Sequence, residues 1–107
     1  MGRIVTVFEL KDKIDRKDEI MIIDMRDPED FEDYHITGSV NIPKEKIKDN
    51  IHLISRDIPV YMVCKYGQKS ESVNSTLRND HHFKNIFSIL GGVYEWAKEF
   101  DPSVEIW

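Results

Sequence analysis

The sequence predicts an α/β fold with a mainly parallel central sheet and helices on both faces. Two continuous apolar runs, at residues 20–23 and 60–63, have the length and composition of strands that are buried on both sides. Segments with strand character alternate along the chain with segments of helical periodicity, which is the pattern of parallel βαβ units. With 107 residues there is room for one core, so we expect residues 1–107 to form a single domain.

The expected strands lie at residues 3–5, 19–24, 40–42, 59–63 and 86–90. The second and fourth strands are apolar nearly throughout and are expected at the centre of the sheet. The third strand is short, because Pro43 follows it and cannot donate a backbone hydrogen bond to a neighbouring strand.

Helices are expected after Thr6, after Asp27, within residues 44–58 (one or two short ones), at about 70–79 and at 93–100. Thr6 and Glu9 have the spacing of a capping box, which favours a helix start. Asp27 and Pro28 are typical of the N-cap and of the first helical position.

Composition limits the function. Apolar residues make up 40% and charged residues 33% of the chain, as in water-soluble globular proteins. The net charge of −5 and the lack of a broad basic face argue against nucleic-acid binding. No apolar run approaches the roughly 18 residues of a membrane span, and the N-terminus lacks the features of a signal peptide. One cysteine cannot form an internal disulfide, so we expect a reducing, cytoplasmic location.

Cys64, the only cysteine, lies where the strand at 59–63 ends and shortly before the next helix. In an open α/β sheet this edge is where ligands bind. A loop containing Gly67 can turn several backbone N–H groups inward, and the following helix N-terminus adds partial positive charge. Both features favour the nucleophilic thiolate. The alternative is a buried, unreactive cysteine, but the polar residues after Cys64 favour a reactive one.

Four segments, taken in order, have the patterns of one known family. They are residues 23–31 (IDMRDPEDF, for D-x-R-x-x-x-E-[FY]), 35–43 (HITGSVNIP, for H-I-x-G-[AS]-x-N-[IL]-P), 64–70 (CKYGQKS, for C-x-x-G-x-x-S) and 90–96 (LGGVYEW, for x-G-G-x-x-x-W). In this combination the chain resembles the rhodanese-like domains. The resemblance implies that Cys64 carries sulfur as a persulfide and passes it to an acceptor.

The resemblance also implies the site residues. The substrate and persulfide loop would consist of Lys65, Tyr66, Gly67, Gln68, Lys69 and Ser70. The two lysines would favour an anionic donor such as thiosulfate, or they are simply solvated. Ser70 would donate a hydrogen bond into the loop, act as N-cap of the next helix, or do both.

The family also carries an acid and an arginine after the second strand, here Asp24 and Arg26, which are expected to brace the sheet edge as a structural ion pair. His35 falls in a segment that orients a turn in the family, so we do not expect it to act as a base.

These features predict a rhodanese-type sulfurtransferase that moves sulfane sulfur from a donor such as thiosulfate to cyanide, a thiol or a carrier protein. Residues 91–103 are similar to the C-terminal rhodanese domain of enzymes that activate ubiquitin-like sulfur carriers, which makes a sulfur-carrier protein a further candidate partner. The chemistry implies no organic cofactor and no metal.

Two alternatives remain at this point. The first is a non-catalytic interaction module with the same fold, although an intact Cys64 argues against it. The second is a Cdc25-like phosphatase, whose loop has an arginine six residues after the cysteine. Ser70 occupies that position here, and residues 57–77 contain no arginine to hold a phosphate.

Overall fold

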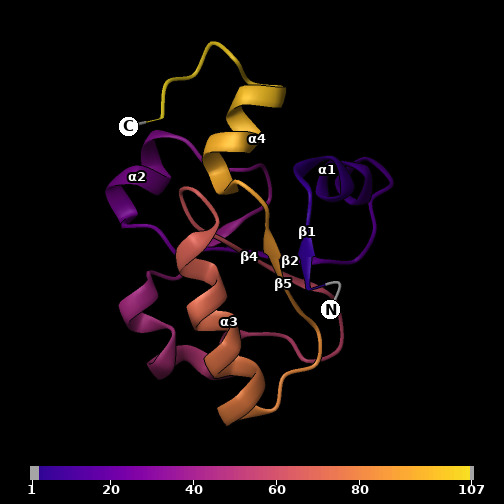
Figure 1. The fold of residues 1–107 in the computed structure, drawn as a ribbon, viewed down its shortest axis with the longest axis vertical. Coiled ribbons are helices and arrows are strands. Elements are labelled where there is room, and N and C mark those ends of the chain that lie inside the picture. The colour runs from indigo at the N-terminus through magenta and orange to yellow at the C-terminus, as the bar shows by residue number, and fades with distance from the viewer. Residues whose placement is uncertain (1–2, 107) are drawn as a thin grey trace.

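The computed structural model describes residues 3–106, except for the side chain of Lys69. The strands are β1 (Ile4–Val5), β2 (Met21–Asp24), β3 (Val40–Asn41), β4 (Val60–Val63) and β5 (Ile86–Ile89). The helices are α1 (Val7–Asp15), α2 (Pro28–Asp33), α3 (Gln68–His81) and α4 (Gly92–Phe100), with 3₁₀ helices η1 (Lys44–Lys46) and η2 (Lys48–Leu53). The strands pair in parallel in the order β1-β5-β4-β2-β3, which confirms the predicted α/β fold (Figure 1).

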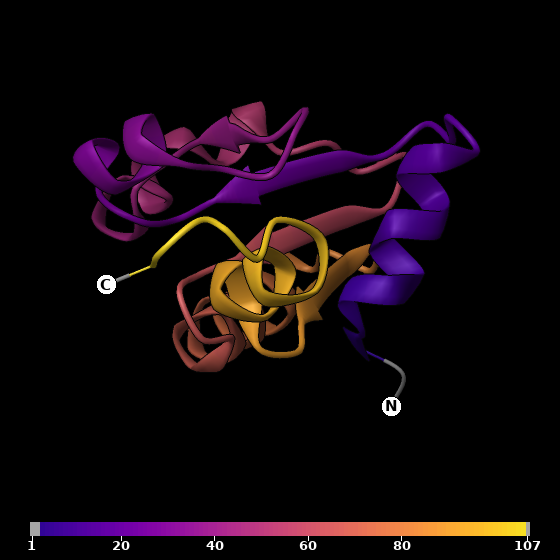
Figure 2. The same cartoon turned by 90° about the horizontal axis from the view of Figure 1, so that it is seen from above.

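Strand β4 lies in the middle of the sheet and separates two hydrophobic clusters. Val60 and Met62 belong to a cluster that includes Leu77 of α3 and the residues around η1 and η2. Tyr61 and Val63 point the other way, into a cluster formed with α1 and α4. All four residues of β4 are buried, as the sequence pattern predicts for a strand covered on both faces (Figure 2).

The element boundaries follow the predictions closely, with one informative difference. Helix α3 begins at Gln68 rather than near Ser70, because Gly67 adopts a left-handed conformation (φ 92°) and is the N-cap. The expectation that Ser70 caps this helix is therefore wrong. A local preference for serine at N-caps is overridden here by the sharp turn that Gly67 permits.

The helix starts at Thr6 and Asp27 differ in their hydrogen bonds. Thr6 accepts a hydrogen bond from the Glu9 amide at 3.1 Å, as the capping pattern predicts. Asp27 is the N-cap of α2, but its side chain accepts no hydrogen bond from that helix. The carboxylate of Asp27 is thus left for other interactions.

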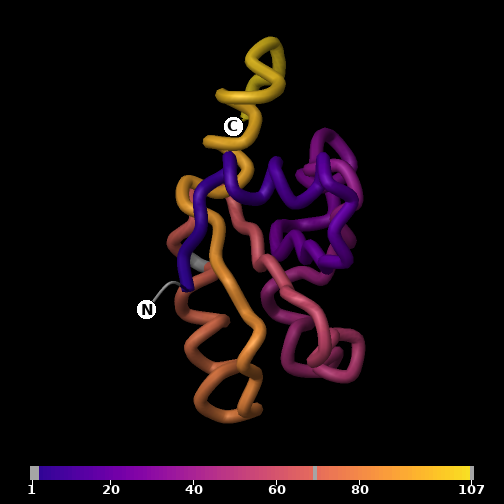
Figure 3. The backbone as a smooth tube through the Cα atoms, turned by 90° about the vertical axis from the view of Figure 1, so that its right-hand side faces the viewer, coloured from indigo at the N-terminus to yellow at the C-terminus, as the bar shows by residue number. Residues whose placement is uncertain are grey.

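The C-terminal part of the chain packs around Trp96, which is 5% exposed. Helix α4 and the segment after it occupy one end of the long axis, and the turn after α3 occupies the other (Figure 3). The Tyr34 hydroxyl donates a hydrogen bond to Asp101, which joins the end of α2 to this segment. Trp107 lies outside the described residues. No helix of residues 3–106 is long and apolar enough to cross a membrane.

Burial, reinforced by the hydrogen bond to Asp101, raises the pKa of Tyr34 above its ordinary value. The unfolded chain then loses the Tyr34 proton near pH 10 while the folded chain keeps it, so this contribution to stability is complete below pH ~10 and is lost above it. We expect Tyr34→Phe to lower the free energy of unfolding at pH 7 by about 1–2 kcal/mol. The difference from the unmodified protein should shrink above pH ~10.

Urea unfolding at several pH values measures this difference. Tyr94→Phe is the control, because the Tyr94 side chain is exposed and its hydroxyl makes no hydrogen bond within residues 3–106. A Tyr34→Phe variant that is as stable as this control at pH 7 would show that the link to Asp101 contributes nothing.

Candidate active site

Cys64 follows the last residue of β4 at the carboxyl edge of the sheet and is only 4% exposed. Its Sγ accepts a hydrogen bond from the Gly67 amide at 3.0 Å. Ser70 Oγ lies 3.8 Å from the same sulfur and donates to the Gly67 carbonyl at 3.0 Å. A backbone amide and a hydroxyl therefore face the sulfur, and Ser70 holds the residue that supplies the amide.

The loop after Cys64 is held by the N-terminus of α4. The carbonyl of Cys64 accepts from the Val93 amide at 2.9 Å, and the carbonyl of Lys65 accepts from the Tyr94 amide at 2.9 Å. The first amides of a helix have no partner within it, and the N-cap here, Gly91, has no side chain to provide one. The two loop carbonyls take that role, so the loop and the helix each depend on the other.

This contact requires glycine at position 92. Gly92 has φ 60°, and a Cβ on it would lie 2.6 Å from the Lys65 carbonyl oxygen and closer still to that of Cys64. Any larger residue would push the loop carbonyls away from α4. The Gly91-Gly92 pair, which belongs to the family pattern at residues 90–96, is thus part of the site.

Met25 forms a wall of the site beside Cys64. Its amide donates to the Val63 carbonyl at 2.8 Å, and its carbonyl accepts from the Lys44 amide at 3.0 Å. These bonds continue the pairing of the sheet beyond β2. They place Met25, which is 4% exposed, in the same hydrophobic cluster as Cys64.

Asp24 and Arg26 form the ion pair that the sequence predicts. Arg26 Nη2 lies 2.8 Å from Asp24 Oδ2, and the two side chains are 7% and 1% exposed. The same guanidinium donates to the Tyr34 carbonyl at 2.5 Å. The Asn41 side chain donates to the carbonyls of Asp24 and Arg26, both at 3.0 Å, and so fixes the turn between them.

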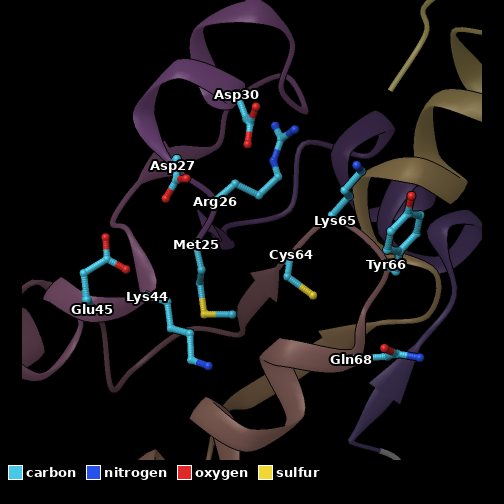
Figure 4. Close-up of a pocket in the computed structure, with 10 residues that line it drawn as sticks. All are labelled: Met25, Arg26, Asp27, Asp30, Lys44, Glu45, Cys64, Lys65, Tyr66 and Gln68. Carbon is cyan, nitrogen blue, oxygen red and sulfur yellow. The ribbon is translucent and has the colours of Figure 1, made fainter. Parts of the chain in front are cut away.

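These elements line a cavity of about 330 Å³ next to Cys64 that is open to solvent (Figure 4). Lys65, Tyr66 and Gln68 of the loop and of the first turn of α3 line one side of it. The Lys65 ammonium lies over the Tyr66 ring at 5.2 Å from its centroid. The remaining lining comes from Met25 and Arg26, from the start of α2 and from η1.

The structure brings most of the predicted site residues together. Cys64, Lys65, Tyr66 and Gln68 line the cavity, whereas Gly67 and Ser70 contact the sulfur. Lys69 lies in the first turn of α3, but its side chain is outside the described part of the chain. His35 does not line the cavity; its ring stacks on Phe31 and its Nδ1 lies 2.7 Å from the Phe31 carbonyl oxygen.

Sequence reasoning missed the residues that approach Cys64 from other parts of the chain. They are Met25, Asp27, Asp30, Lys44, Glu45 and Gly92. Met25, Asp27, Asp30 and Gly92 lie within the family patterns, which are a usable signal. Lys44 and Glu45 carry no such signal, since only the pairing of β2 with β3 brings them to this edge.

A family model described as the rhodanese-like domain matches residues 6–99. The chain belongs to the rhodanese-like domain family. The thiosulfate sulfurtransferase GlpE of Stutzerimonas stutzeri is 32% identical over 85 residues, which cover 79% of this chain and 77% of GlpE. The crystal structure of the protein SSP1007 from Staphylococcus saprophyticus is 30% identical with a TM-score of 0.79, and the match covers 90% of this chain and 94% of that one.

Other relatives are longer than this rhodanese-like chain. The probable adenylyltransferase/sulfurtransferase MoeZ of Mycobacterium tuberculosis is 29% identical over 105 residues, which are 96% of this chain but 26% of MoeZ. The putative sulfur carrier protein YrkF of Bacillus subtilis is 26% identical over 93 residues, or 87% of this chain and 50% of YrkF. The chain thus spans half or less of these curated relatives.

The steric requirement at Gly92 gives a prediction. Gly92→Ala should destabilise the protein more than Gly38→Ala, because both glycines have positive φ but a Cβ at Gly38 meets no atom within 4 Å. The control should cost about 1–2 kcal/mol for the backbone conformation alone. Gly92→Ala should cost at least about 1–3 kcal/mol more for displacing the loop carbonyls. Urea unfolding measures both; equal costs would show that the loop does not depend on this contact.

The buried ion pair gives another prediction. Arg26→Gln should lower the free energy of unfolding by about 3–5 kcal/mol, because it leaves the Asp24 carboxylate buried without its partner. Lys11→Gln is the control: it removes an exposed pair with Asp15 and should cost about 0.5 kcal/mol or less. Adding Asp24→Asn to Arg26→Gln should recover part of the loss in a double-mutant cycle. Additive costs in that cycle would contradict a coupled pair.

Proposed function

We propose that this chain is a sulfurtransferase that carries sulfane sulfur on Cys64. The observation that supports it most directly is the Cys64 sulfur, which receives the Gly67 amide at 3.0 Å and borders a cavity of about 330 Å³. A sulfur held in this way is a nucleophile at a fixed position with room for a substrate in front of it. Its relative GlpE is named a thiosulfate sulfurtransferase, which agrees with this chemistry.

In the first half-reaction the Cys64 thiolate attacks the outer sulfur of thiosulfate. A new S–S bond forms, the S–S bond of thiosulfate breaks, and sulfite leaves with the electron pair. Cys64 then holds a persulfide anion. Its outer sulfur extends from Sγ into the cavity beside Met25 and the loop, where Lys65 offsets the negative charge.

In the second half-reaction an acceptor removes that sulfur. Cyanide attacks the outer sulfur, the S–S bond to Cys64 breaks, and thiocyanate and the Cys64 thiolate result. A thiol or a sulfur-carrier protein takes the place of cyanide as the biological acceptor, in line with the names of the relatives YrkF and MoeZ. Because the chain has one cysteine, no second internal thiol can discharge the persulfide. A reducing compartment such as the cytoplasm keeps Cys64 in its reactive form.

The two alternatives make different demands on the site. A phosphatase needs a planar donor group for the equatorial oxygens of phosphate. Arg26, the arginine that lines the cavity, already uses Nε and Nη2 for Asp24 and the Tyr34 carbonyl. An interaction module needs no reactive sulfur, whereas this site places a free cysteine against an amide donor.

The decisive experiment is the intact mass of the protein after incubation with thiosulfate. We expect a gain of one sulfur atom that cyanide removes as thiocyanate. Cys64→Ser should show neither the mass gain nor thiocyanate formation, since no other residue of the chain has a thiol. Ser72→Ala is the matched control. It removes an exposed hydroxyl from α3, the helix that follows the Cys64 loop, and should behave like the unmodified protein.

Each alternative has its own result in this experiment. Hydrolysis of aryl phosphates that depends on Cys64, without sulfur transfer, would establish the phosphatase. A folded protein that gains no sulfur from thiosulfate and hydrolyses no phosphate would favour the interaction module. Normal turnover by the Cys64→Ser variant would show that Cys64 is not the sulfur carrier.

A further inference from the structure

Met25 lies beside Cys64 at the carboxyl edge of the sheet. In the parallel pairing of β2 with β4, Asp24 is the partner of Val63. The next residues of the two chains are Met25 and Cys64, so these two come level with each other. The Met25 amide donates to the Val63 carbonyl at 2.8 Å, which continues the pairing to this point. Both side chains belong to one hydrophobic cluster, and each residue is 4% exposed. Figure 4 shows the Met25 side chain next to Cys64 at the cavity.

Met25 differs in chemistry from the rest of the cavity lining. Among the residues that the structure describes, it is the one aliphatic side chain that lines the cavity; the others, apart from Cys64, carry a charge, an amide or a phenol. Its main chain is hydrogen-bonded on both sides, to the Val63 carbonyl and to the Lys44 amide, so the point from which its side chain starts is fixed. A thioether has no proton to donate to a neighbouring sulfur. The contribution of Met25 to the chemistry of Cys64 is therefore to occupy space and to exclude other groups.

The surroundings of Cys64 Sγ differ from those that the outer sulfur of a persulfide would have. The Gly67 amide lies 3.0 Å and the Ser70 hydroxyl 3.8 Å from Sγ, and Met25 covers the side toward β2. The outer sulfur would extend into the cavity, which is open to solvent. A thiolate can attack either sulfur of a persulfide, and access helps to decide between them. The structure leaves the outer sulfur more accessible than Sγ.

We propose that Met25 is a specificity-determining residue: it shields Sγ, so that an acceptor thiol attacks the outer sulfur of the Cys64 persulfide. This inference rests on the proposed function and concerns the discharge of the same site. In the productive step a bond forms between the acceptor sulfur and the outer sulfur, the S–S bond of the persulfide breaks, and its electron pair stays on Sγ as the Cys64 thiolate. In the competing step the acceptor thiolate attacks Sγ, a mixed disulfide forms with Cys64, and the outer sulfur leaves with the electron pair as hydrosulfide. In both steps the outer sulfur carries one proton, taken up from solvent.

The test compares the two products of one reaction. Inorganic polysulfide loads Cys64: the thiolate takes one sulfur, and a polysulfide that is shorter by one sulfur leaves. The loaded protein is desalted and mixed with glutathione, and acid stops the reaction before a second glutathione can reduce the adduct. Intact mass then separates the protein that has lost one sulfur from the glutathione adduct. We expect the loss of sulfur to account for nearly all of the product in the unmodified protein.

Variants assign this preference to the Met25 side chain. Met25→Ala should raise the ratio of adduct to sulfur loss about tenfold, which is the size of discrimination that small apolar groups give in a site. Met25→Val removes less of the side chain, should raise the ratio by less, and provides the test if Met25→Ala does not fold. Met25→Leu keeps the volume and should keep the low ratio. Met21→Ala is the matched control: it truncates a methionine of β2 that packs against the same cluster but does not line the cavity, and the ratio should stay low.

A ratio of adduct to sulfur loss that is the same in the Met25 truncations and in the Met21→Ala control would overturn this inference. A predominance of the adduct in the unmodified protein would overturn it as well. Loading with polysulfide keeps the result separate from that of the proposed function. A protein that thiosulfate does not load, but whose persulfide gives the expected ratios, would refute thiosulfate as donor and support the role of Met25. A persulfide that cyanide removes but glutathione leaves intact would support Cys64 as the sulfur carrier and overturn this inference.

Discussion

The geometry around Cys64 depends on two hydrogen bonds from the start of α4 to the loop that follows β4. The amides of Val93 and Tyr94 hold the carbonyls of Cys64 and Lys65, so these carbonyls point toward α4. The next part of the loop can then turn the Gly67 amide toward the sulfur. Each bond contributes only about 1 kcal/mol to stability, but together they fix the direction of successive peptide groups. The arrangement exists because Gly92 leaves room for the carbonyls, which makes a steric constraint on α4 a condition for the site.

The opposite wall of the cavity depends on a second constraint, at the end of β2. Met25 is held on both sides by backbone hydrogen bonds, and the turn that follows is fixed by the buried pair of Asp24 and Arg26. A buried ion pair adds little net stability, because the cost of removing both charges from water offsets their attraction. Its effect here is geometric: it sets the path of the chain into α2. That path brings Asp27 and Asp30 to the cavity.

Local patterns in the sequence are sufficient to predict the strands and to place Cys64 at the end of one of them. Apolar runs and a single thiol can be recognised without knowledge of tertiary contacts. Local patterns failed at the start of α3, where the left-handed conformation of Gly67 outweighs the N-cap preference of Ser70. They also gave no indication of Lys44 and Glu45. These residues reach the cavity through the pairing of β2 and β3, and such long-range register is not encoded in any short segment.

The same contacts fit the proposed chemistry on sulfur better than the transfer of a phosphoryl group. The Gly67 amide points at Sγ itself, and Ser70, which also approaches the sulfur, donates its proton to the Gly67 carbonyl. Helix α3 begins at Gln68, so few loop residues remain to surround a tetrahedral group. Transfer of a phosphoryl group requires donors around its equatorial oxygens, and Arg26 is committed to Asp24 and to the Tyr34 carbonyl. A thiolate needs donors directed at only one atom, and the loop directs the Gly67 amide at Sγ.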